Sequence, residues 1–385
     1  YLIESAKAWN TVATDESTYN GKVLILGDNL DFSQTDSDEM NYPFTGKIYG
    51  NGYLIENFAG STGLIKNTGN NLYLNYIQLT KSTCSLIGTI NAGSNVAVIG
   101  CSIFNGSITS SSVVGGIVRG LLNGQKITLI VNHTKVLNST ILCTGDGQGV
   151  GILIGRSDGG HSIELNNCMV RDCWLEAKTR NVGGLIGYVT CSFTASHCEV
   201  KDCTIIAENI SVGGLVGRMN PATGGISHCE DCEVSHCNIA GTDNVGGLAG
   251  FFRYSSMDNC KAINCNISGS AGVGSLVGSA WGDATTTVSQ SIALSCNVRG
   301  SSTTTTGGVL GNGLGTFVNC IAGKSGEEVY VSPRSGNDVN GTDVTATMTD
   351  CSASIVDTPF DLTFPTEEQI KIFPASKLPY VYVTY

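Results

Sequence analysis

The sequence is poor in charge. Only 14% of its 385 residues are Asp, Glu, Lys or Arg, and the 21 basic residues are outnumbered by 32 acidic ones, which gives a net charge of −11. Binding to the phosphates of nucleic acids requires clustered cations. We therefore expect no nucleic acid among the partners of this protein.

Long apolar runs and helical periodicity are also absent. No stretch of 18 apolar residues occurs, so we expect no integral membrane segment. No repeating unit contains ten residues with a 3.6-residue period, which excludes helical repeats and leucine-rich repeats with a helix. No export signal is visible, and because the chain begins at Tyr1 rather than Met, we expect a signal peptide to have been removed.

Glycine, by contrast, is abundant, with 50 residues. The tract Val-Gly-Gly-Leu-Ile-Gly at 182–187 recurs almost unchanged at 212–217, 245–250 and 273–278. Looser copies begin at Val150 and Thr306, so successive tracts start 32, 30, 33, 28 and 33 residues apart. A near-constant period of this size predicts a solenoid.

Each period contains three short apolar runs separated by polar or glycine-rich turns. Short runs rich in Val, Ile and Thr predict strands. We therefore expect an all-β, parallel β-helix in which each rung gives one strand to each of three sheets, with about nine or ten rungs stacked ~4.8 Å apart.

The glycine tract is interpreted as a tight corner, because glycine adopts positive φ without penalty. Leu185 and its equivalents Leu215, Leu248 and Leu276 would then point into the core. A phosphate-binding glycine loop is the alternative, but such a loop precedes a helix and does not repeat many times.

The 16 cysteines follow the repeat. One position of successive rungs holds Cys168, Cys198, Cys232 and Cys260, and another holds Cys173, Cys203, Cys237, Cys265 and Cys296. We expect two internal ladders of small apolar side chains. A disulfide needs Cβ atoms about 3.8 Å apart, closer than the spacing of neighbouring rungs, so most of these residues should be free thiols.

A zinc site is the alternative for one cysteine-rich segment. His228, Cys229 and Cys232 lie close in sequence to His236 and Cys237. Cys-x2-Cys is a known ligand spacing, but a second matched pair is missing. We expect no metal and no other cofactor.

The two ends of the chain lack the tract. Residues 1–58 are expected to form an N-terminal cap, with a helix within Glu4 to Ser17 that places Ala8, Trp9, Val12 and Ala13 on one side. Strands are expected at 22–26 and on both sides of Gly50 to Gly52. An open solenoid end needs such a cap. We assign 59–356 to the β-helix of roughly 30-residue rungs, and 357–385, which contains four prolines, to a C-terminal cap or linker.

The repeats and the opening of the chain together resemble the GLUG-motif repeat proteins. The resemblance lies in the Gly-Gly-Leu-hydrophobic-Gly repeats, in Asn29-Leu30-Asp31 and in the stretch from Pro43 to Ile55, and it covers most of the first 320 residues. It implies a right-handed β-helix in an exported bacterial protein, outside the cell or on the outer-membrane surface, that acts as a non-enzymatic stalk or binding module. The cysteine ladders depart from the family pattern.

Polysaccharide lyases and hydrolases also use β-helices, so an enzyme is the alternative function. Such sites need carboxylates clustered on one face, with each other or with Arg or Lys. Asp172 and Asp202 share one position in adjacent rungs, but the next rungs carry His236, Asn264 and Ser295 there, as in a polar stack at a turn. No nucleophile elbow or His-Glu-x-x-His motif occurs. We therefore expect no catalytic residues and no enzymatic activity.

Ligand binding is predicted beside the glycine tracts. The residue after each tract is Arg156, Tyr188, Arg218, Phe251, Ser279 or Asn312, with Arg119 near the corresponding place in an earlier rung. If these side chains point outward, they form a stripe of cations and aromatic rings, which can stack on sugars and bind carboxylates. Tyr254 and Trp281 would extend it. The candidate site residues are thus Arg156, Tyr188, Arg218, Phe251, Tyr254 and Trp281.

The expected partner is a host or bacterial surface glycan or protein, bound by an adhesin-like or spacer module. Two alternatives remain. The side chains of the stripe could simply cover the sheet, and the whole chain could be a purely structural stalk.

Overall fold

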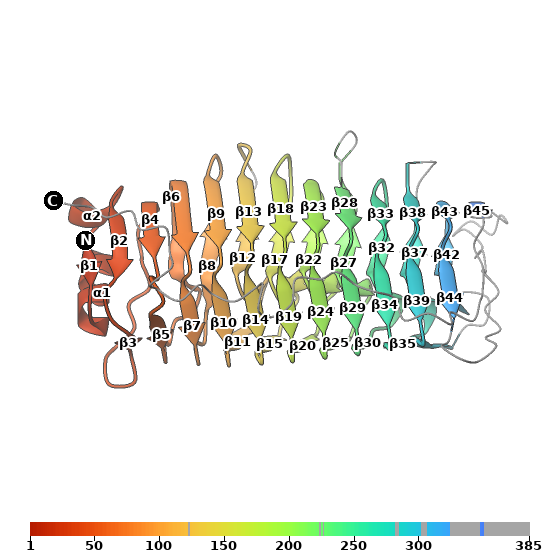
Figure 1. Ribbon diagram of the computed structural model, residues 1–385, viewed down its shortest axis with the longest axis horizontal. Helices are drawn as coiled ribbons and strands as arrows, with labels where there is room; N and C mark the ends of the chain where they lie inside the picture. The colour runs from red at the N-terminus through yellow and green to blue at the C-terminus, as the bar shows by residue number, and fades with distance from the viewer. Residues whose placement is uncertain are drawn as a thin grey trace.

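The computed structural model describes residues 1–121, 124–222, 225, 227–281, 285–301, 306–323 and 347–349. In this part the chain winds into a rod of stacked turns (Figure 1). Strands of successive turns pair in parallel and in register, as Ile163 does with Phe193 and Leu175 with Ile205. The predicted all-β parallel solenoid is confirmed.

The cross-section is more finely divided than expected. One turn contains five short strands, not three: β18 (Ser162–Asn166), β19 (Met169–Arg171), β20 (Trp174–Ala177), β21 (Val182–Gly183) and β22 (Ile186–Val189). Stacking of equivalent strands produces sheets that we call A, B, D, E and C in this chain order. Sheets A and C join into one 21-stranded sheet through β6, while sheets B, D and E have 11, 7 and 6 strands. The solenoid has about seven turns, fewer than the nine or ten expected.

The strands of sheet A besides β18 are β1 (Leu2–Ile3), β2 (Val23–Leu26), β4 (Phe44–Tyr49), β6 (Gly63–Asn75), β9 (Asn95–Ile99), β13 (Thr128–Asn132), β23 (Ser192–Ser196), β28 (Ser227–Glu230), β33 (Ser256–Asp258), β38 (Thr287–Ser289), β43 (Thr316–Val318) and β45 (Thr347–Thr349). Sheet C contains, besides β22, β8 (Ser85–Ile90), β12 (Val118–Leu121), β17 (Ile154–Ser157), β27 (Val216–Met219), β32 (Ala249–Phe252), β37 (Val277–Ala280) and β42 (Leu310–Gly313).

Sheet B contains, besides β19, β3 (Leu30–Asp31), β5 (Leu54–Glu56), β7 (Gln78–Thr80), β10 (Ser102–Phe104), β14 (Lys135–Leu137), β24 (Glu199–Lys201), β29 (Glu233–Ser235), β34 (Lys261–Ile263), β39 (Ile292–Leu294) and β44 (Ile321–Gly323). Sheet D contains β11 (Ser107–Ser110), β15 (Thr140–Cys143), β20, β25 (Thr204–Ala207), β30 (Asn238–Ala240), β35 (Asn266–Gly269) and β40 (Asn297–Gly300). Sheet E contains β16 (Val150–Gly151), β21, β26 (Val212–Gly213), β31 (Asp243–Gly246), β36 (Ala271–Gly274) and β41 (Thr306–Gly307).

Single residues in the left-handed conformation turn two of the corners. Asn167 stands between sheets A and B with φ 51°, and Asp172 stands between sheets B and D with φ 54°. Asn, Asp and His, whose short polar side chains hydrogen-bond locally, tolerate this region better than most residues. The same corner in later turns is occupied by Asp202, His236, Asn264 and Ser295, all at positive φ. Asp172 and Asp202 thus belong to a stack of turn residues, as predicted.

Glycine is required in the tract for a different physical reason from the one predicted. None of the glycines in 182–187 is at positive φ. A Cβ on Gly184 would instead lie 2.2 Å from the main-chain oxygen of Gly214 and 2.8 Å from Cγ1 of Val200, and one on Gly187 would lie 2.2 Å from the nitrogen of Val150. These glycines are needed because main chains of neighbouring turns approach too closely for any side chain. The expectation of a positive-φ corner is therefore wrong.

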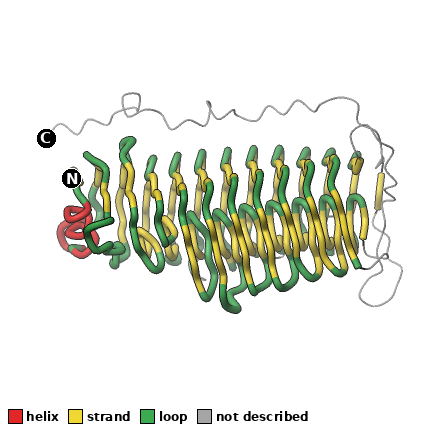
Figure 2. Tube along the Cα trace, turned by 90° about the horizontal axis from the view of Figure 1, so that it is seen from below, coloured by secondary structure: helices red, strands yellow, loops and turns green. Residues whose placement is uncertain are grey.

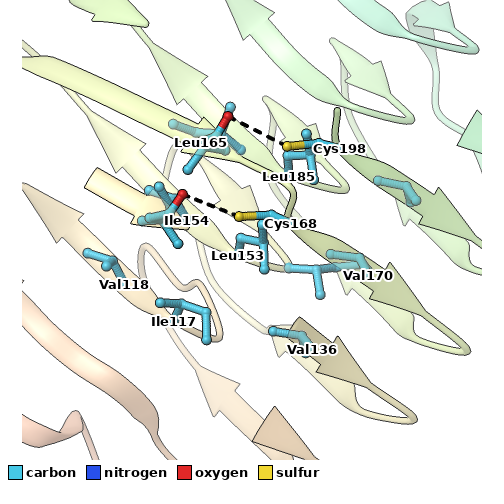
Figure 3. Packing of buried hydrophobic residues seen from close by; sticks show 14 of the residues in the cluster. Ile117, Val118, Val136, Leu153, Ile154, Leu165, Cys168, Val170, Leu185 and Cys198 are labelled. Carbon is cyan, nitrogen blue, oxygen red and sulfur yellow. Dashed lines mark hydrogen bonds between the residues drawn. The ribbon is translucent and has the colours of Figure 1, made fainter. Parts of the chain in front are cut away.

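The interior of the rod is continuous and apolar. Leu185, Leu215, Leu248 and Leu276 are fully buried, as predicted. Figure 3 shows part of this core, where Leu153 and Leu185 of successive turns pack beside Cys168 and Cys198.

The cysteines form two columns in this core. All 15 described cysteines are free thiols, and 14 of them are buried. Each thiol of a column hydrogen-bonds main-chain carbonyls, as Cys198 does with Leu165 of the preceding turn at 3.7 Å (Figure 3) and with Ser196 at 3.4 Å. Ser139 and Ser291 occupy equivalent places and donate to the corresponding carbonyl at 2.8 Å. The position therefore selects a small side chain with a hydrogen-bond donor, and the predicted ladders are confirmed.

Thiol titration should reflect this burial. We expect the 14 buried cysteines to resist a thiol reagent in the native protein, and all 16 to react after unfolding in urea without reductant. The reason is that a buried thiol is neither accessible nor ionised, and the thiolate is the reactive form. Fewer than 15 reactive thiols after unfolding would contradict the absence of disulfides among the described cysteines.

The N-terminal end begins with two short helices, α1 (Ala6–Thr14) and α2 (Glu16–Tyr19). Ser5 caps α1 by accepting a hydrogen bond from the N–H of Ala8, and Trp9 is fully buried. This confirms the predicted helix. Neither helix is long enough to span a membrane, and the described residues contain no other helix.

The strands β4 and β5 flank the Gly50 to Gly52 turn but do not pair with each other. β4 belongs to sheet A and β5 to sheet B, so the turn is a corner rather than a hairpin. Sheets A and B therefore begin within residues 1–58. Residues 357–385 lie outside the described residues, and their assignment to a cap or linker stays a prediction.

Candidate ligand-binding surface

The residues that follow the glycine tracts form one column on sheet C. Arg156 is in register with Tyr188, Tyr188 with Arg218 and Arg218 with Phe251. The column continues through Ser279 and Asn312. Because the strands pair without a register shift here, the predicted stripe exists as a set of adjacent side chains.

Arg119 lies outside the column. Gly120, not Arg119, is in register with Arg156. The guanidinium of Arg119 instead donates hydrogen bonds to the carbonyl of Val113 at 2.8 Å and to the hydroxyl of Ser112 at 2.5 Å. Arg119 therefore stabilises the loop that precedes β12 in its own turn.

Cations and rings alternate along the column. The Cζ of Arg156 lies 5.2 Å from the ring centre of Tyr188, and that of Arg218 lies 5.8 Å from Tyr188 and 4.5 Å from Phe251. All four side chains are half-buried. Cation–π attraction at such sites contributes about 0.5–1 kcal/mol per contact. The column therefore stabilises the stacking of turns whether or not it binds a ligand.

The two arginines differ in their partners. Arg156 forms an ion pair with Asp158, and its side chain is 32% exposed. Arg218 has neither an ion pair nor a hydrogen bond among the described residues, and its Nε is buried without a partner. A guanidinium normally satisfies several of its five donors when it is partly buried. Arg218 is therefore the group in this column whose donors are free for a ligand.

Two buried polar residues, Asn181 and Ser211, lie next to the main chain of sheet C strands β27 and β32. Asn181 is 1% exposed and Ser211 is fully buried, and neither Oδ1 of Asn181 nor Oγ of Ser211 has a hydrogen-bond partner. A Cβ on Gly217, the neighbour of Arg218, would lie 2.6 Å from the main-chain carbon of Asn181, and one on Gly250 equally close to that of Ser211. The main chains of Asn181 and Ser211 thus pack closely against those two glycines of sheet C.

The ring faces, however, are not free. Tyr188 has a guanidinium over its ring from each neighbouring turn, Arg156 and Arg218, and Phe251 has that of Arg218. The predicted stacking of sugars on these faces would require the arginines to move. Donation from Arg218 to an anionic group fits the observed arrangement.

Tyr254 and Trp281 do not extend the column. Tyr254 turns the chain between β32 and β33 with φ 49°, and its ring lies 4.4 Å from the Cζ of Arg253, which also donates a 2.7 Å hydrogen bond to its hydroxyl. Trp281 follows β37 and is half-buried. In the described part of the chain, neither ring contacts the four residues of the column.

The residues considered for zinc lie on opposite faces of the sheet. Cys229 and Cys232 are buried in the core, whereas His228 points outward and hydrogen-bonds Ser256 at 2.7 Å. Across the described ranges, no three His, Cys, Asp or Glu side chains converge closely enough for a metal ion. This donor set does not fit zinc.

The exposed aromatic residues, among them Trp174, were not predicted from the sequence. Trp174 begins β20 on sheet D and is 44% exposed. It stands in a single rung, so the repeat gives no signal for it. The alternation Trp-Leu-Glu-Ala could have placed it outward, since Leu175 is buried.

Comparison with known proteins gives little for this chain. No protein-family model and no curated protein matches it. Among solved structures, a candidate immunoglobulin A1 protease from Bacteroides ovatus is similar, with 16% sequence identity and a TM-score of 0.45, over 61% of this chain and 75% of that one.

Proposed function

We propose that this protein is an exported, non-enzymatic β-helix that serves as an adhesin-like binding or spacer module outside a bacterial cell or on its outer membrane. The resemblance of its repeats to GLUG-motif proteins supports this. Arg218, held between Tyr188 and Phe251 with no anionic partner, carries the proposal of binding. An isolated guanidinium on a half-buried column suits a ligand that supplies a carboxylate.

The ligand we propose is a glycan with carboxylated sugars, such as uronic or sialic acids. The carboxylate would accept a bidentate hydrogen bond from Arg218. The edges of Tyr188 and Phe251 would border the sugar ring. Asp158 neutralises Arg156, so that residue contributes less.

A matched pair of substitutions tests this proposal on an array of carboxylated and neutral glycans. Arg218→Gln should lower the affinity for carboxylated glycans at least about tenfold, as expected for loss of ~1.4 kcal/mol, whereas Arg156→Gln should change it little. The double variant Tyr188→Ala, Phe251→Ala should abolish binding, because it removes both residues that hold Arg218 in place. Urea midpoints of the variants control for folding. Unchanged binding in Arg218→Gln would sink the site.

A structural stalk is the second candidate. The in-register contacts between cations and rings favour it, because they stabilise turn stacking without any ligand. If no glycan binds the wild-type protein and Arg218→Gln only lowers its thermal stability, the stalk is the better description.

A further inference from the structure

Sheet D offers a second surface, unlike the column on sheet C. Its strands lie side by side along the rod (Figure 2), and its outward residues alternate with buried ones such as Leu175 and Ile205. One outward column is uncharged over all seven strands: Ser107, Thr140, Trp174, Thr204, Asn238, Asn266 and Asn297. In a chain with a net charge of −11, this column is made of hydroxyls, amides and one indole. The second outward column of the sheet holds Thr109, Leu142, Glu176, Ile206, Ala240, Ser268 and Arg299.

Trp174 is the most accessible ring in this column. Its Nε1 donates a 3.2 Å hydrogen bond to Glu176 two residues along the same strand, which fixes the orientation of the indole. No described residue makes a ring or cation contact with it. The neighbours in register, Thr140 and Thr204, are small, and Trp174 is 44% exposed. Tyr188 and Phe251, by contrast, have arginines on their faces.

The amides farther along the column, at Asn238 and Asn266, keep hydrogen-bonding capacity for a ligand. Asn266 donates from Nδ2 to Oδ1 of Asn238 at 2.8 Å. Each amide has two N–H donors and an oxygen with two lone pairs, so this ladder leaves donors and acceptors directed to solvent. Because strands are ~4.8 Å apart, the same groups recur at a constant step along the rod.

We propose that sheet D binds a neutral polysaccharide chain lying along the rod, with one sugar ring stacked on Trp174 and its hydroxyls hydrogen-bonded by the flanking Thr and Asn side chains. The occupant follows from the chemistry of the face. An uncharged ligand matches an uncharged column, and a polyhydroxylated one matches repeated amides and hydroxyls. Trp174, with the half-buried Leu142 and Ile206 of the second outward column, offers too little apolar area for a stable protein interface, which usually buries about 800 Å² per partner. This site is separate from the one in the proposed function and takes a different class of ligand.

Affinity electrophoresis tests this inference. Native gels are cast with hydroxyethylcellulose, galactomannan or laminarin as neutral polysaccharides, and with polygalacturonate as the anionic comparison. We expect at least one neutral polysaccharide to retard the wild-type protein, and Trp174→Ala to weaken that binding at least about tenfold, while Trp174→Phe keeps part of it. Phe104→Ala is the matched control, because Phe104 is 46% exposed on sheet B.

Three results would overturn the inference. The first is that no neutral polysaccharide retards the wild-type protein. The second is equal retardation of the wild-type protein and Trp174→Ala. The third is dimerisation, seen by light scattering and abolished by Trp174→Ala, which would make sheet D an interface between copies of the chain. Arg218→Gln should leave neutral binding unchanged, and Trp174→Ala should leave binding of carboxylated glycans unchanged. The two sites can therefore fail independently.

Discussion

Raising the pH from 7 to about 11 is expected to unfold the rod, because burial raises the pKa of several of its thiols. Burial raises the pKa of Cys101 to about 12 and that of Cys191 to about 11, and it also raises the pKa of Cys84, Cys168 and Cys232. The folded protein keeps these protons, whereas the unfolded chain releases them near its thiol pKa of ~8.5. The stabilisation is thus complete below that pH and lost as pH rises toward 12.

The expected loss of stability at high pH is large because several buried thiols contribute to it. Each such thiol lowers the free energy of unfolding by about 1.4 kcal/mol per pH unit within the window. Across the whole window, the summed loss from several such thiols exceeds the typical free energy of unfolding of a domain, about 5–15 kcal/mol. Circular dichroism followed from pH 7 to 12, with the urea midpoint measured at each step, should show a steep decline above about pH 9.

A variant without some of the thiols provides the control. Cys101→Ser, Cys168→Ser and Cys232→Ser in one chain should shift the alkaline transition to higher pH, since Ser does not titrate and occupies the same position at Ser291. At pH 7 the variant should lose little stability. A wild-type urea midpoint that stays constant up to pH 11 would contradict this account of the core.

The architecture could be predicted because it depends on repetition. The tract at 182–187 and the cysteine spacing recur every turn, so period alone gave the parallel solenoid, the buried leucines and the thiol columns. The division of a turn into five strands could not be predicted in this way. The strands of sheet E contain as few as two residues, Val182–Gly183 for example, too short for a hydrophobic pattern.

The candidate sites show the same limit. Repetition correctly placed Arg156, Tyr188, Arg218 and Phe251 next to each other, because equivalent positions of a solenoid stack. It could not show that the arginines cover the ring faces, since side-chain conformation is not a property of the period. Trp174 was missed because it breaks the repeat instead of following it.

The corrected role of the tract glycines leads to a second large effect. Gly184→Ala should lower the free energy of unfolding by about 3 kcal/mol or more, at the upper end of overpacking effects. The added Cβ would meet the main-chain oxygen of Gly214 at 2.2 Å, and a main-chain oxygen within a paired turn cannot move alone. Because each turn packs against the next, a displacement of the main chain at Gly214 would be transmitted to neighbouring turns. Urea denaturation and limited proteolysis would measure it.

Gly160→Ala is the matched control, because a Cβ there has no heavy atom within 4 Å. Where the backbone accepts alanine, this change stabilises a protein by about 0.4–1 kcal/mol through the unfolded state. The two substitutions add the same methyl group and remove the same flexibility, so their difference isolates the contact between turns. If the tract needed glycine for positive φ, as the sequence pattern first indicated, alanine would be harmful because it disfavours that conformation. Gly184 does not have a positive φ. The harm is therefore expected from the contact of the added Cβ, which alanine and serine share.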